Sequence, residues 1–277
     1  MSCAWRDSFF CEVGACLKTV GLHTIFLQRC IVSDQTLSVI ATHSAATLQR
    51  LVLFETSSYD RTIEGLYTAS GVRSILQSCH QLKHLEMGGG FQWNQKERIT
   101  HEAWNSTGVV CCGLETLCLG NQQTDDASVT AIMTLFPDLQ VVAITCMNHR
   151  EHVLGFSSLL ALAGLPQLRH LDLRRMDRAL CLSKSCIQAL APALGRIESF
   201  SAEIRENERD AYESLFRRLC PSPHLTDLWL NVPLWVRFPG GCLSLDSDTP
   251  LMPNWLADEP TEMQYPYRPE DLWEDSE

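Results

Sequence analysis

The chain has 277 residues, of which 45% are hydrophobic and 20% charged, a balance typical of a folded protein that excludes global disorder. Its formal net charge of −11 is uneven, because residues 246–277 hold ten acidic residues and one basic residue. The rest of the chain lacks the clustered basic residues that bind nucleic acid, so no nucleic acid is expected as a partner. No apolar run is long enough to span a bilayer, so no membrane is expected as a partner either.

The cysteine content indicates a reducing compartment. There are 13 cysteines, and residues 1–20 show no apolar core of a secretory signal. We therefore expect reduced thiols in the cytosol or nucleus, mostly acting as small buried hydrophobic residues.

One six-residue pattern recurs eight times along the chain. It consists of an apolar residue, two variable residues, an apolar residue, one variable residue and a last apolar residue. Successive copies start 25 to 34 residues apart, at Leu22, Leu48, Leu82, Leu114, Leu139, Leu168, Ile197 and Leu225. The alternation at the end of each copy predicts a short strand with one buried face.

Segments with helical spacing lie between the copies. They are residues 34–41, 124–133, 183–191 and 210–216. Ser33 or Asp34 is placed to cap the first of them, and acidic residues stand in the first turn of the second. The long intervals 57–78 and 91–110 are predicted to be loops or extended helix–strand links. The second interval, with Trp93 and Trp104, is either a binding loop or an ordinary surface loop.

A strand and a helix in each unit predict an α/β solenoid with parallel inner strands and outer helices. The period and the pattern resemble those of leucine-rich repeats, which stack into a horseshoe. About eight repeats fill residues 17–245. Residues 1–16 are expected to form a capping helix or the remnant of another domain, and the acidic, proline-rich residues 246–277 to be disordered.

The resemblance extends to the cysteine-containing leucine-rich repeats of F-box proteins, which are of the ribonuclease-inhibitor type. Cys79 and Cys111 stand three residues before the first Leu of their copies, and Phe136, Leu165 and Leu194 hold the same position in later copies. Cys30 follows the last Leu of its copy by three residues. Residues 3–10, Cys-Ala-Trp-Arg-Asp-Ser-Phe-Phe, resemble the closing helix of an F-box, most of which would be missing; a capping helix is the alternative.

This resemblance implies a protein-binding module. In the family, the repeats recruit the protein to be ubiquitinated by an SCF-type ubiquitin ligase, and the F-box binds a Skp-type adaptor. Two alternatives stay open: a stand-alone repeat scaffold without a ligase link, and, less favoured, a GTPase-activating protein of the ribonuclease-inhibitor type.

Residues between the buried leucines are predicted to point to the concave side of the solenoid. Eight strands spaced by about 4.8 Å would give a row about 34 Å long, enough for a standard protein interface. The candidate partner-binding residues are Phe26, Arg50, Phe54, His84, Glu86, His170, Asp172, Arg174, Asp227 and Trp229.

No motif indicates catalysis. The sequences G-x-S-x-G, Walker A and H-E-x-x-H are absent, and the glycines at 88–90 lack a following Lys-Ser/Thr. The pair His149 and His152 and the group Cys79, His80 and His84 bring possible metal ligands close together in the sequence. A structural zinc site needs four ligands, typically in separated pairs, and Cys111-Cys112 and Cys181-x4-Cys186 do not make that pattern. We therefore expect no enzymatic activity, no cofactor and no bound metal.

Overall fold

The structure is a computed structural model that describes residues 21–28, 32–54, 67–88, 113–120, 126–145, 155–173, 182–202, 209–219 and 222–230. All of them lie within the predicted repeat domain, 17–245. The predicted terminal segments, 1–16 and 246–277, lie outside the described residues, as does the interval 91–110.

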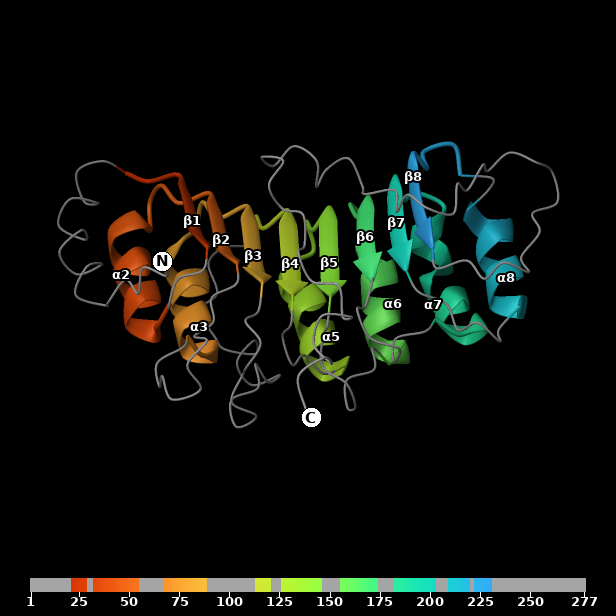
Figure 1. Ribbon diagram of the computed structural model, residues 1–277, viewed down its shortest axis with the longest axis horizontal. Coiled ribbons are helices and arrows are strands. Elements are labelled where there is room, and N and C mark those ends of the chain that lie inside the picture. Colours follow the sequence, from red (N-terminus) through yellow and green to blue (C-terminus); the bar gives the residue numbers. More distant parts are fainter. Residues whose placement is uncertain are drawn as a thin grey trace, which may run out of the picture.

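The eight copies of the pattern form eight strands of one parallel sheet (Figure 1). The strands are β1 (Thr24–Gln28), β2 (Arg50–Phe54), β3 (His84–Gly88), β4 (Thr116–Gly120), β5 (Val141–Thr145), β6 (His170–Leu173), β7 (Ser199–Ala202) and β8 (Asp227–Leu230). Their order in the sheet is their order in the sequence. The predicted α/β class with parallel strands is confirmed. The copy that starts at Ile197 also forms a strand, although Phe200 and Ala202 stand where most copies have leucine.

Helices alternate with the strands. They are α2 (Asp34–Ser44), α3 (Ala69–Ser78), α5 (Asp126–Leu135), α6 (Phe156–Gly164), α7 (Lys184–Leu194) and α8 (Arg209–Leu219). Four of them confirm the helices predicted from spacing and capping residues. The interval 57–78, for which the sequence favours a loop or an extended helix–strand link, ends in α3. The sequence did not predict α6, because its residues are apolar on most sides and its Gly155 cap makes no side-chain hydrogen bond.

A single carbonyl group fixes the register at each joint between neighbouring strands. The carbonyl oxygen of His23, just before β1, accepts hydrogen bonds from the backbone N–H groups of Gln49 (2.8 Å) and Arg50 (2.9 Å). The residue before each later strand up to β7 does the same for the next unit, ending with Glu198, which accepts from Thr226 and Asp227. Alternate residues therefore stay aligned across all eight strands.

The aligned register places the pattern leucines against the helices. Leu51, Leu85, Leu117 and Leu171 lie at equivalent positions of their strands and are buried in one continuous core with the inner sides of the helices. Burying a leucine side chain contributes roughly 1.5–3 kcal/mol, so the repeated pattern and the inner sides of the helices stabilise the stack together. No unit could bury these side chains alone.

The position three residues before the first Leu of a copy closes the turn from helix to strand. Cys79, Phe136 and Leu165 are buried there, and each carbonyl oxygen accepts a hydrogen bond from the N–H of the first Leu, at 3.1, 3.4 and 3.5 Å respectively. This explains the apolar residues at that offset in the sequence. The requirement is a buried, apolar side chain, which cysteine satisfies as well as larger groups do.

Neighbouring helices are joined by carboxylates at their N-termini. Asp34, in the first turn of α2, accepts hydrogen bonds from the backbone N–H groups of Thr68 (2.6 Å) and Gly71 (3.0 Å) at the start of α3. Asp126 in α5 accepts in the same way from the N–H of Ser158 in α6 (2.9 Å) and also bonds the Ser158 hydroxyl. Each carboxylate thus satisfies donors that the next helix leaves unpaired.

A guanidinium group joins two helices at their C-terminal ends. Arg196, which follows α7, donates hydrogen bonds to the carbonyl oxygens of Ala163 (2.7 Å) and Leu165 (2.5 Å) at the end of α6. It also bonds the Pro192 carbonyl of α7. A cation at this place satisfies carbonyl groups that have no partner within the helix.

Gly71 makes room for the Asp34 carboxylate, and this can be tested by substitution. A Cβ atom at Gly71 would lie 2.3 Å from Asp34 Oδ1. Alanine inside a helix is normally favoured over glycine by roughly 0.5–1 kcal/mol, but overpacking costs about 1–3 kcal/mol. We expect Gly71→Ala to lower the free energy of unfolding in urea by about 1–2 kcal/mol.

The matched control is Gly164→Ala at the end of α6, where a Cβ atom would meet nothing within 4 Å. This variant should be as stable as the wild type or slightly more stable. If the two variants were equally stable, the Asp34 carboxylate would not need the space that Gly71 leaves at the start of α3.

Candidate functional site

The candidate site is the side of the sheet turned away from the helices, which we call the second face. Figure 1 shows the helices along one side of the row of strands, and the core lies on that side. The second face is formed by the residues that alternate with those of the core on the helix side: Thr24, Phe26, Gln28, Arg50, Val52, His84, Glu86, Thr116, Cys118, Val141, Ala143, His170, Asp172, Ser199, Ser201, Asp227 and Trp229.

Most of the candidate partner-binding residues are brought together on this face. Phe26, Arg50, His84, Glu86, His170, Asp172, Asp227 and Trp229 all lie on it. Phe54 is the last residue of β2, and only its backbone is described. Arg174 lies outside the described residues. That these residues bind a partner stays a prediction.

The part of the face formed by β1 to β3 combines an exposed aromatic group with charged groups. Phe26 is 45% exposed, one of the few large apolar side chains at the surface of the described residues. In the neighbouring strands Arg50 pairs in register with His84, and His84 Nε2 lies 3.5 Å from Glu86 Oε2. Aromatic and arginine side chains are the types that most often anchor protein interfaces.

The part formed by β6 and β7 is less accessible than the sequence alone indicates. Asp172 and Ser199 are each 2% exposed, and Ser201 is 1% exposed, although all three lie on the second face. In the structure, a partner would not reach these side chains. It would reach the partly exposed ones, such as Asp227 and Trp229 of β8.

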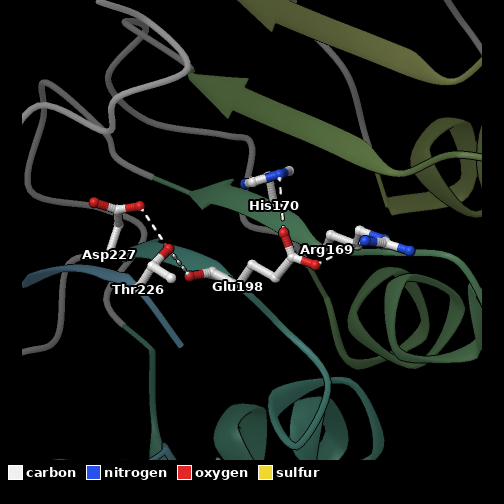
Figure 2. A network of polar contacts seen from close by, with 5 residues as sticks. All are labelled: Arg169, His170, Glu198, Thr226 and Asp227. Atoms are coloured by element: carbon white, nitrogen blue, oxygen red, sulfur yellow. Dashed lines mark hydrogen bonds and ion pairs between the residues drawn. The ribbon is translucent and has the colours of Figure 1, made fainter. Parts of the chain in front are cut away.

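Polar side chains link three successive units beside this region (Figure 2). Arg169 Nη1 lies 2.9 Å from Glu198 Oε1, and the other carboxylate oxygen, Oε2, lies 3.8 Å from His170 Nε2. Thr226 Oγ1 lies 3.0 Å from the Glu198 carbonyl oxygen and 2.8 Å from Asp227 Oδ2. Glu198 therefore holds a fixed place between β6 and β8, with one side of its carboxylate facing the imidazole.

At two joints, the residues just before neighbouring strands carry opposite charges. The ion pair of Arg169 with Glu198 has a counterpart at 2.8 Å between Lys83 and Glu115, two equivalent positions one unit apart. Sequence reasoning missed both pairs. The sequence did contain a signal for them, because residues of opposite charge stand at the same position of consecutive copies. Exposed pairs of this kind contribute at most about 1 kcal/mol each, so they orient side chains more than they hold the fold.

Burial determines the charge state of His170. Burial lowers the pKa of its imidazole below the ordinary value of 6.5, and Arg169 acts in the same direction, whereas Glu198 and Asp227 act against it. His170 is therefore neutral near pH 7. Beside Glu198 it supplies a neutral hydrogen-bonding group to the second face, not a cation.

The described cysteines and histidines do not converge on a metal site. Within the ranges that the structure describes, no three His, Cys, Asp or Glu side chains form a group that could hold a metal ion. Cys79 is buried in the core whereas His84 lies on the second face, on the other side of the sheet. His149 and His152 lie outside the described residues, as do Gly89 and Gly90.

The three described cysteines, Cys79, Cys118 and Cys186, form no disulfide. Cys79 is buried, as expected, whereas Cys118 and Cys186 are partly exposed. Burial raises the pKa of the Cys79 thiol to about 11.

No protein-family model matches the chain, and neither does any curated protein.

Of the helices in the described ranges, none combines the length and the apolar character needed to cross a bilayer.

The lowered pKa of His170 should make stability depend on pH. Between pH 6.5 and the lower pKa of the folded protein, the unfolded chain binds more protons at this residue than the folded chain, so stability falls as the pH falls. Between about pH 7.5 and about pH 5.5, the wild type should lose more free energy of unfolding than His170→Gln does. Urea titrations at each pH measure the difference.

The exposed His224, substituted in His224→Gln, controls for the removal of one histidine. If His170→Gln loses as much stability as the wild type over this pH range, the inference that folded His170 is neutral is wrong.

The Cys79 thiol should be inert in the folded protein. A pKa of about 11, raised from 9.0, lowers the thiolate fraction about 100-fold, and burial blocks access as well. Alkylation by iodoacetamide at about pH 8, followed by peptide mass spectrometry, should modify Cys118 long before Cys79. In urea the two should react at similar rates. Equal rates in the folded protein would contradict the burial of Cys79.

Proposed function

We propose that the chain is a protein-binding leucine-rich-repeat module whose units stack into a horseshoe, with the second face on its concave side. The main support is the single parallel sheet, whose strands follow one another in the order of the sequence. Its register puts Phe26, Arg50 and Trp229 on the same face. Parallel sheets with helices on both faces have strands that are apolar throughout. Here β3 and β6 alternate polar and apolar residues, as expected when helices cover only one face. Strand β5 is more apolar, and Val52 and Ala143 are buried on the second face.

The second face has the chemistry of a protein interface. Exposed Phe26, partly exposed Trp229 and Arg50 are the types that anchor interfaces, and the charged groups between them are of both signs. A face of this kind selects a protein partner with apolar groups and complementary charges. It does not have the excess of basic groups that a nucleic acid requires.

The proposed activity of the module is to recruit proteins to an SCF-type ubiquitin ligase, as in F-box proteins. Support comes from the repeat position that F-box repeats fill with cysteine or a small apolar residue, because Cys79 is buried there and closes the turn from helix to strand. Phe136 and Leu165 close the equivalent turns but are larger than the residues typical of the family. The segment that resembles the end of an F-box, residues 3–10, lies outside the described residues. The alternative proposal is a scaffold that binds its partner without the ligase.

A substitution on the second face should remove partner binding. Phe26→Glu places a charge where an apolar anchor is proposed, and loss of an anchor costs about 2 kcal/mol or more, which is roughly a 30-fold loss of affinity. Proteins that co-purify with the wild-type chain from cells, quantified by mass spectrometry, should be depleted by at least about tenfold with this variant.

Phe156→Glu is the matched control, because Phe156 is also an exposed phenylalanine but lies on α6, away from the second face. Partners retained by Phe26→Glu, or lost equally with both variants, would exclude the second face as the binding surface.

The ligase proposal is tested separately with a purified Skp-type adaptor. The full chain should form a complex with the adaptor, detected by size-exclusion chromatography, and Trp5→Ala should weaken it. Trp229→Ala, on the second face, should leave adaptor binding unchanged. If the wild-type chain does not bind the adaptor while Phe26-dependent partners persist, the protein is a stand-alone scaffold.

A further inference from the structure

We draw no further inference here: the strongest candidate, the surface patch formed by the exposed Phe156 and Leu160 on helix α6, carries nothing because no feature of the described residues shows what covers it.

Discussion

Each strand from β2 to β8 begins with two hydrogen bonds to one carbonyl group of the preceding unit. The Lys83 carbonyl oxygen, for example, accepts from the N–H groups of Glu115 and Thr116, and this holds β4 in place beside β3. A slip of one residue would move Leu117 out of the core and bring Thr116 or Cys118 into it. The composition of the second face is therefore a consequence of core packing, because the leucines are kept on the other side of the sheet.

The helix layer depends on polar groups as much as on apolar ones. Asp34 and Asp126 occupy equivalent places at the start of their helices, and each satisfies the first turn of the helix that follows. In both cases a glycine of the next unit, Gly71 or Gly155, leaves space for the carboxylate. The same combination thus appears at two joints of the array and links each of these helices to its neighbour by directional bonds that apolar contacts cannot provide.

The sequence predicts the strands better than the helices. All eight strands follow from a pattern with a period of two residues and regular spacing, whereas helices were found only where capping residues and a one-sided apolar pattern coincide, as in α2. Helix α6 has neither signal, because Leu159, Leu160 and Leu162 surround its axis. Its place is set by packing between α5 and α7, which becomes visible only after the units are stacked.

The candidate site was predicted in its position but not in its accessibility. Alternation along a strand determines which side of the sheet Asp172 and Ser201 lie on, and this was correct. It gives no information on what else packs there, so their burial could not be foreseen. The ion pair of Arg169 with Glu198 also depends on which strands are neighbours, and the neutral state of His170 depends on burial, neither of which a single strand reveals.

The order of the strands also has a consequence for how the molecule is made. Because β1 to β8 lie in the sheet in the order in which they are synthesised, every strand meets its partner in the unit just completed. None of the eight described strands pairs with a distant part of the chain, and each closure spans about one repeat, which keeps its entropic cost small. The described array can therefore grow on the ribosome from its N-terminal end, one repeat at a time, with each new strand adding to the edge left by the one before it.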